Sequence, residues 1–147
     1  MNILILGAGQ VGSELTEILS EDGHSITLVD LDEEKLEKES EQHDIKIVSG
    51  NCCYPQTLED ANIQDTELAI AMTEWDEVNL VACQMIKHLN KKTRTMARIR
   101  AREYLKGKGN KIFENGEYSI DVLISPETLI TEYISKLVQL PGALQVL

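Results

Sequence analysis

Three glycines near the amino terminus have the spacing that brings a phosphate close to a polypeptide backbone. In the stretch MNILILGAGQVG, Gly7, Gly9 and Gly12 directly follow an apolar run. In such a turn the first glycine permits the bend, the second lets a diphosphate approach, and the third lets a helix pack on a strand. The alternative is a turn that only needs glycine dihedral angles. We predict that the diphosphate contacts are Gly7, Ala8, Gly9, Gln10, Val11 and Gly12.

A carboxylate follows where a bound dinucleotide would carry its adenosine ribose. Asp30 ends the next apolar run after the glycine turn. A carboxylate that accepts hydrogen bonds from both ribose hydroxyls contributes about 1.5–3 kcal/mol per charged bond, and it repels a 2′-phosphate. These residues predict a nucleotide site that prefers NAD(H) to NADP(H). The alternative is a doubly wound domain that binds no ligand.

Six apolar runs have the length of strands and are mostly continuous, which is typical of strands covered on both faces. Helical patterns over 12–20, 32–38 and 77–89 alternate with these runs, with Gly23 as a helix-ending glycine and Asp32 as an N-cap. Strand and helix in alternation predict an α/β fold with a doubly wound, Rossmann-like parallel sheet of six strands. The predicted strands are 3–6, 26–29, 45–48, 68–72, 95–99 and 122–124.

The segment after Pro126 has the pattern of one amphipathic helix over 127–138, which predicts a C-terminal crossover helix. Since the sequence ends soon after this helix, we expect its apolar stripe to face something outside the domain. We divide the chain into a nucleotide-binding domain over 1–124 and a crossover helix with linker over 125–147. The stripe consists of Leu129, Ile130, Tyr133, Ile134 and Leu137.

Composition argues against several classes of partner. Fourteen basic and twenty-five acidic residues give a net charge of -11, which repels nucleic acids and anionic lipids. No run approaches the roughly 20 apolar residues of a membrane span, so we expect a cytoplasmic chain without membrane insertion. Cys52, Cys53 and Cys83 have no metal-binding spacing, so we expect free thiols and no metal.

Residues suited to catalysis are scarce in this chain. A dehydrogenase must also hold a substrate beside the nicotinamide and supply a proton donor. Tyr104 and Lys108 have the spacing of the tyrosine–lysine pair of short-chain reductases, but Gly107 and Gly109 interrupt that helix. We therefore expect no catalytic residue. The alternative is a small NAD-dependent oxidoreductase or a cofactor-binding fragment of one.

Several further segments resemble the regulator-of-potassium-conductance family, also called RCK, KTN or TrkA-N. The resemblance extends from Met1 to about Leu140 and is far more specific than the glycine turn alone. It rests on GNCCYPQTLEDANI over 50–63, TEWDEVN over 73–79, Ala97-Arg98-Ile99 with Tyr104, and DVLISPETLITEYI over 121–134.

The resemblance implies contacts on the adenosine side of the site. Asp30 with Leu31 would contact the adenosine ribose, and Asn51 with Cys52 would lie on the adenine side. The pair formed by Cys52 and Cys53 departs from the small or acidic residues of the family at these positions.

The resemblance also implies contacts at the ends of the fourth and fifth strands. Thr73 and Glu74 would lie across the topological switch point, where such sheets bind ligands. Arg98 would project toward the phosphates or toward a neighbouring subunit's nucleotide, because an arginine fork suits phosphate oxygens. The alternative is a structural arginine that faces Glu74 or Glu77. Trp75 is another departure from the family's residues.

What the resemblance implies is a regulator without catalytic activity. It would bind NAD(H), with ATP or ADP possible at the same site, and form a homodimer or a higher ring through this lobe and the crossover helix. Its partner would be a membrane potassium transporter or channel, which would hold it at the inner face of the cell membrane. The family's usual C-terminal lobe is absent from this sequence, so we expect a fragment or a shortened member.

Overall fold

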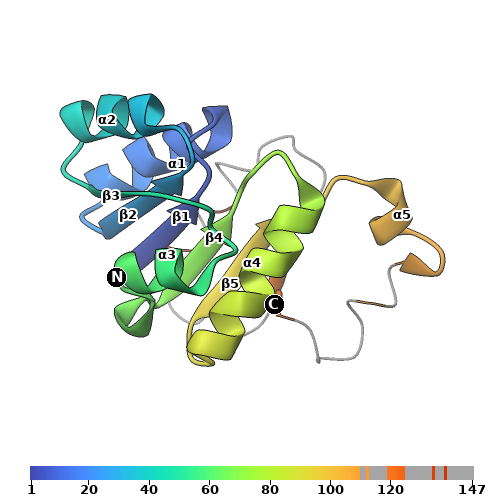
Figure 1. Cartoon of the computed structure of the whole chain (residues 1–147). Coiled ribbons are helices and arrows are strands. Elements are labelled where there is room, and N and C mark those ends of the chain that lie inside the picture. The colour runs from blue at the N-terminus through green and yellow to red at the C-terminus, as the bar shows by residue number, and fades with distance from the viewer. Residues whose placement is uncertain (110–111, 113–118, 125–133, 135–137, 139–147) are drawn as a thin grey trace.

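The computed structural model describes residues 1–109, 112, 119–124, 134 and 138. Six strands form one sheet in the order β3-β2-β1-β4-β5-β6, and all of the pairings are parallel (Figure 1). This is the strand order of the doubly wound dinucleotide-binding fold, so the predicted fold class is confirmed. The strands are β1 Asn2–Leu6, β2 Ser25–Asp30, β3 Lys46–Ser49, β4 Leu68–Ala71, β5 Arg94–Arg98 and β6 Val122–Ile124.

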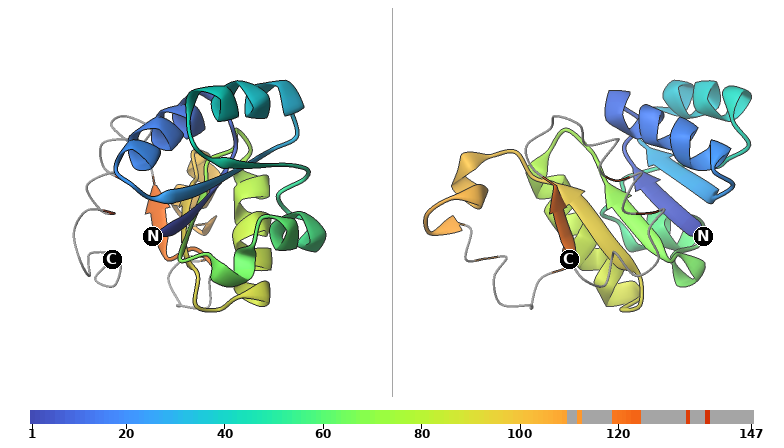
Figure 2. Two further views of the ribbon diagram at one scale, coloured as in Figure 1. Left: turned by 90° about the vertical axis from the view of Figure 1, so that its left-hand side faces the viewer. Right: turned by 180° about the vertical axis from the view of Figure 1, so that it is seen from behind.

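Helices cover both faces of the sheet (Figure 2). One face carries α1 (Gln10–Glu21) and α2 (Glu33–Gln42), and the other carries α3 (Pro55–Asp60) and α4 (Asp76–Leu89). A short 3-10 helix, η1 (Ile63–Asp65), follows α3, and α5 (Arg102–Leu105) projects away from the sheet. The three helices predicted from periodicity are present, and each is longer than its pattern indicated.

The ends of α1 and α2 follow the predicted caps. Asp32 accepts hydrogen bonds from the N–H groups of Glu34 and Lys35, which is the geometry of an N-cap. Gly23 has a φ of +86° just after α1, and its N–H donates to the carbonyl of Ser20. A left-handed glycine at this place ends the helix by satisfying its last carbonyls.

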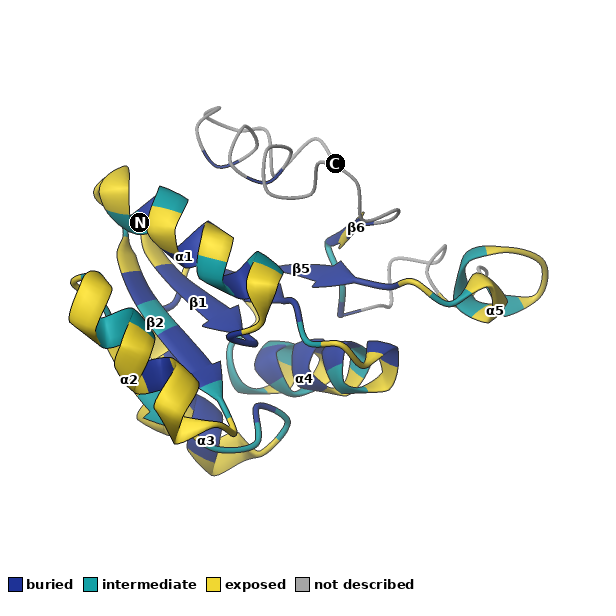
Figure 3. Cartoon of the chain, turned by 90° about the horizontal axis from the view of Figure 1, so that it is seen from above, coloured by how far each residue is buried: buried dark blue, intermediate teal, exposed yellow. Residues whose placement is uncertain are grey.

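Two apolar layers hold the helices on the sheet, because successive strand residues point to opposite faces. Leu15 and Leu19 of α1 pack with Ile3 and Ile5 in one layer. In the other layer, α3 and α4 pack on alternate strand residues such as Leu4 and Leu6. The view in Figure 3 shows the buried strands beneath α1 and the exposed outer surface of α2. Burial of each such leucine or isoleucine side chain contributes about 1.5–3 kcal/mol to the free energy of folding, relative to a side chain left exposed.

Strand β3 differs from its prediction. It is the outermost strand on its side of the sheet, so it pairs only with β2 among the described residues. Ile47 is 36% exposed, and Lys46 and Ser49 are exposed as well. The expectation of a strand covered on both faces is therefore wrong here, because an edge position leaves side chains in contact with solvent.

Two residues of the predicted crossover helix are described, and both are helical and buried. Ile134 and Val138 pack in the layer of α1 together with Met96, Val122 and Ile124. Contrary to our expectation for the stripe, Ile134 thus faces this chain's own sheet. The physical reason is that α1 and α2 cover the β1–β3 side of this face, which leaves apolar residues of β4, β5 and β6 to be covered. The rest of the stripe lies outside the described residues.

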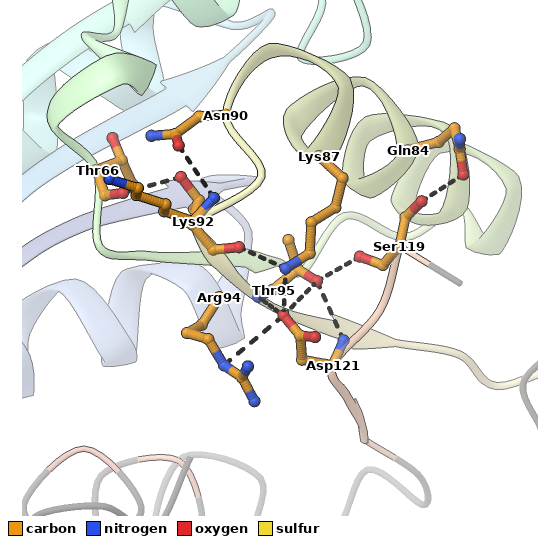
Figure 4. A network of polar contacts seen from close by, with 10 residues as sticks. Thr66, Gln84, Lys87, Asn90, Lys92, Arg94, Thr95, Ser119 and Asp121 are labelled. Atoms are coloured by element: carbon orange, nitrogen blue, oxygen red, sulfur yellow. Dashed lines mark hydrogen bonds and ion pairs between the residues drawn. The ribbon is translucent and has the colours of Figure 1, made fainter. Parts of the chain in front are cut away.

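A polar network attaches the short strand β6 to β5 and α4 (Figure 4). Asp121, just before β6, accepts hydrogen bonds on its Oδ2 from the Lys87 Nζ at 2.7 Å and from the Thr95 N–H at 2.9 Å. The Thr95 hydroxyl donates to the carbonyl of Ser119, whose own hydroxyl donates to Gln84 of α4. A three-residue strand has few ladder bonds, so these contacts supply much of its attachment.

Replacement of Asp121 by alanine should lower the stability of the domain. It would leave the Thr95 N–H without its acceptor and the Lys87 ammonium with only the carbonyl of Thr93 among the described residues, at a cost of about 1–3 kcal/mol. The free energy of unfolding is measured by urea denaturation. Asp44→Ala, at an exposed aspartate, is the matched control and should stay within about 0.5 kcal/mol of the parent. Equal unfolding midpoints for both variants would contradict the proposed importance of this network.

Candidate functional site

A cleft of about 470 Å3 lies at the carboxyl edge of the sheet. It spans the switch point between β1 and β4, where the chain crosses to opposite sides of the sheet and where open α/β sheets bind ligands. Turns after five strands contribute to its lining. The lining residues are Gly7, Gly9, Gln10, Val11, Val29, Asp30, Leu31, Lys35, Gly50, Asn51, Cys52, Met72, Thr73, Glu74, Trp75, Val78, Arg98 and Arg100.

The cleft brings together the residues that the sequence singled out, with two exceptions. Ala8 and Gly12 are not among its lining residues, although both belong to the glycine turn. Sequence reasoning did not assign a contact to Lys35, on the first turns of α2, or to Arg100, just after β5. Arg100 follows Arg98 by two residues, and alternate residues of an extended chain point to the same side. This spacing was the sequence signal that could have placed Arg100 in the cleft.

The three glycines meet different surroundings. A Cβ atom on Gly12 would lie 1.8 Å from the carbonyl oxygen of Gly7, so only glycine lets α1 pack this closely on the turn. Gly7 has a φ of +109°, and a Cβ there would lie 3.0 Å from the carbonyl oxygen of Met72. A Cβ on Gly9 would meet no atom within 4 Å among the described residues. Gly9 therefore leaves open space on the cleft side of the turn.

The amino terminus of α1 faces this open space. Its N-cap is Gly9, which has no side chain to cap the helix, and the carbonyl of Gly9 accepts the N–H of Ser13 at 2.8 Å. The N–H groups of the first turn have no intrahelical acceptors. Together with the positive end of the helix dipole, they favour an anion at Gly9, Gln10 and Val11.

Asp30 is fixed by two backbone donors. Its Oδ2 accepts the N–H of Ala8 at 2.7 Å, and its Oδ1 accepts the N–H of Asp32 at 2.8 Å. Each carboxylate oxygen has a further lone pair, so Asp30 can still accept hydrogen bonds from hydroxyl groups in the cleft. The N–H of Ala8 already has Asp30 as its acceptor, and it therefore serves the geometry of the turn.

The turn after β4 is organised by Asn79, a fully buried residue of α4. Its Oδ1 accepts the N–H of Thr73 at 3.0 Å and the hydroxyl of Thr73 at 2.7 Å. Its Nδ2 donates to the carbonyl of Thr73 at 3.2 Å and to that of Arg98 at 2.7 Å. One amide thus joins the ends of β4 and β5. Its sequence signal was a polar residue on the apolar face of a helix.

Two arginines line the cleft from the end of β5. Arg98 is buried, and one terminal nitrogen donates to the carbonyls of Met72 at 3.2 Å and Thr73 at 3.0 Å. These acceptors are main-chain groups, which sequence reasoning did not anticipate. The terminal nitrogen of Arg100 donates to the carbonyl of Glu74 at 2.7 Å. Asp76, in the first turn of α4, accepts the N–H of Arg100 at 3.0 Å and so holds the chain after β5.

Burial favours the neutral thiol form of the three cysteines. Cys52 and Cys83 are buried, and burial raises the pKa of each to about 12. Burial also raises the pKa of the half-buried Cys53. All three cysteines are free thiols, as the sequence predicted. Within the described part of the chain, no three histidine, cysteine or acidic side chains gather in a way that would hold a metal ion.

Tyr104 and Lys108 do not form a reductase-like pair. Helix α5 ends at Leu105, so the two residues do not share a helical face. The hydroxyl of Tyr104 donates to Glu77 at 2.6 Å, and this hydrogen bond raises the pKa of the phenol. The raised pKa is opposite to the lowered value that proton transfer by a tyrosine needs near neutral pH.

Over the described residues, no helix has both the length and the apolar character to span a bilayer.

Residues 3–126 match the TrkA-N domain family. The chain belongs to this family. It is 47% identical over 146 residues to the Trk system potassium uptake protein TrkA of Haemophilus influenzae, and the match covers 99% of the chain and 32% of that protein. The TrkA protein of Halomonas elongata is 45% identical over 147 residues, with 100% and 32% covered. This TrkA-N domain thus spans about a third of the length of these relatives.

Solved structures share the fold of this TrkA-N domain. The TrkA-N domain of the inner membrane protein ybaL from Escherichia coli has a TM-score of 0.74 at 17% identity, covering 94% of this chain and 96% of that one. A GsuK channel bound to NAD has a TM-score of 0.68 at 19% identity, covering 84% and 21%. GsuK bound to ADP has a TM-score of 0.67 at 19% identity, covering 84% and 30%. At these identities the likeness concerns the fold alone.

Serine at Gly12 should lower the stability of the domain, whereas serine at Gly9 should leave it almost unchanged. Gly12→Ser drives a side chain into the backbone of the turn and should cost about 3 kcal/mol or more. Gly9→Ser should stay within about 0.5 kcal/mol, because serine is a favourable N-cap and its side chain enters open space. Urea denaturation of both variants measures the difference. A fully stable Gly12→Ser variant would contradict the close packing of α1 on this turn.

Proposed function

We propose that this TrkA-N domain binds NAD(H), with ATP or ADP as possible ligands of the same site, and has a regulatory role without catalysis. The observation that carries the proposal is the carboxylate of Asp30, held by two backbone donors beside the open backbone of Gly9. A sugar acceptor and an anion-binding helix terminus are thus adjacent. Adenosine diphosphate, which is common to all of these ligands, needs both.

The lining residues suggest how such a ligand would be held. The diphosphate would lie over Gly7, Gly9, Gln10 and Val11, at the amino terminus of α1. Ala8 and Gly12 would act from behind the turn, through the Asp30 hydrogen bond and through helix packing. Asp30 and Leu31 would contact the adenosine ribose, Asn51 and Cys52 the adenine side, and Thr73, Glu74 and Arg98 the part of the cleft beyond the switch point.

The carboxylate also favours one class of dinucleotide. A 2′-phosphate on the adenosine ribose would lie against Asp30, and two anions in contact repel each other. NAD(H) is therefore preferred to NADP(H). The ligands named for the GsuK structures, NAD and ADP, have a free 2′-hydroxyl and agree with this choice.

Asp30→Asn should weaken NADH binding about 10- to 100-fold, because a neutral amide replaces a charged acceptor of the ribose hydroxyls and its single oxygen keeps only one of the two backbone hydrogen bonds. Isothermal titration calorimetry measures the dissociation constant. Asp32→Asn is the matched control, since it makes the same change two residues away, outside the cleft lining, and asparagine also caps helices well. Equal NADH affinity for the parent and Asp30→Asn, with unchanged melting temperatures, would remove Asp30 from the proposed site.

We further propose that the nucleotide controls a membrane potassium transporter or channel through a homodimer or a higher ring. The relatives named Trk system potassium uptake protein support this role, and the chain corresponds to about a third of their length. The segment over 1–124 would be the nucleotide lobe, and 125–147 would lead toward the rest of the assembly. In this arrangement the domain would lie in the cytoplasm at the inner face of the membrane. A nucleotide can shift such an assembly only if it binds one arrangement more tightly than another.

Native mass spectrometry of the purified chain tests assembly and ligand together. We expect dimers or larger oligomers that retain a nucleotide, with a distribution that changes when NADH is added. Asp30→Asn should form oligomers without responding to NADH at the same concentration. A chain that stays monomeric with and without nucleotide would contradict assembly through this domain and leave the nucleotide site to the calorimetric test.

A further inference from the structure

The two most exposed large apolar side chains in the described part of the molecule line the same cleft. Leu31 is 73% exposed and Trp75 is 64% exposed. Removal of such apolar surface from water is favourable, so these two side chains favour the binding of a group that covers them. Since both side chains line the cleft, a ligand with apolar faces that binds there would bury them.

The backbone presents Trp75 at a fixed place. Its N–H donates to the hydroxyl of Thr73 at 3.3 Å, and its carbonyl accepts the N–H of Asn79 at 3.0 Å. Asn79 is fully buried and also holds Thr73. The exposed indole is therefore attached to a turn with little freedom to move, as a preorganised contact surface requires.

The two apolar residues reach the cleft from opposite layers. Trp75 is the N-cap of α4, which lies in the layer of α3 and α4. On that side the Cys53 Sγ donates to the carbonyl of Val78 at 3.5 Å, which joins the turn after β3 to the first turn of α4. Leu31 follows β2 and leads into α2, in the other layer. A flat ring held between these layers would contact both walls.

We propose that Trp75 stacks on the adenine base of the nucleotide bound in this cleft. The inference rests on the proposed function and adds a base-recognition residue to it. Aromatic stacking on a base contributes to binding without selecting among bases, because every base has a π face. The same indole therefore serves NADH and ADP. Removal of its ring should weaken every ligand that carries a base and spare inorganic pyrophosphate, which has none.

Trp75 is the single tryptophan of the chain, so its fluorescence reports directly on this contact. Titration with ADP should quench the emission as the base covers the indole. Inorganic pyrophosphate, whose binding calorimetry follows independently, should leave the emission unchanged. Quenching by pyrophosphate equal to that by ADP would overturn the stacking contact, because the signal would then report on the phosphates.

Two substitutions distinguish the contribution of the aromatic ring to binding from that of side-chain volume. Trp75→Leu should weaken ADP and NADH about 5- to 100-fold, and Trp75→Phe, which keeps a π face, should lose less. Tyr54→Leu is the matched control, because Tyr54 is 60% exposed but is not a lining residue of the cleft. Its affinities should match those of the parent. Circular dichroism and thermal melts should show that all of these variants fold.

The outcomes distinguish this inference from the proposed function. Parent-like ADP and NADH affinity in Trp75→Leu would overturn the role of Trp75 and leave the nucleotide site standing. A parallel loss of pyrophosphate affinity in Trp75→Leu would also overturn it, because the residue would then be shaping the turn. A parent protein that binds neither ADP nor NADH would overturn the proposed function, and this inference with it.

Discussion

The hydrogen bond from the Ala8 N–H to Asp30 is the interaction on which the candidate site depends. It joins the turn after β1 to the end of β2 at 2.7 Å, so the carboxylate and the glycine turn have one fixed relation. Gly12 completes the arrangement, because its missing side chain lets α1 begin against the same turn. The proposed sugar acceptor and the helix terminus are thereby positioned before any ligand arrives, which would lower the entropic cost of binding.

Helix α4 performs the corresponding task across the switch point and continues beyond it. Asn79 and Asp76, in its first turns, hold the backbone that follows β4 and β5. Toward its other end, Lys87 contacts Asp121 at the start of β6. Strand β6 in turn shares a core with Ile134. Helix α4 thus connects the cleft to the C-terminal part of the chain, and a displacement of α4 would be transmitted through these contacts to β6.

The sequence was most informative where physical signals are local. Continuous apolar runs located six strands, and the spacing of Gly7, Gly9 and Gly12 located the turn. Exposure of Ile47 depends on the position of β3 in the sheet, which its own residues do not encode. The short helices α3 and α5 have too few turns for a periodic pattern. Lys35 escaped assignment because the walls of a cleft depend on which distant turns converge.

Local and overall charge have opposite signs at this site, and this bears on what can bind. The chain as a whole carries a net charge of -11, yet the cleft has three cationic side chains, Lys35, Arg98 and Arg100, against the two carboxylates of Asp30 and Glu74. Salt screens charges beyond about 8 Å, so a phosphate in the cleft responds mainly to this nearby set. In the proposed binding mode, the carboxylate of Asp30 would disfavour a further phosphate on the ribose. Attraction of a diphosphate and discrimination against a 2′-phosphate would therefore arise from the same few side chains, while the acidic remainder repels polyanions such as nucleic acids.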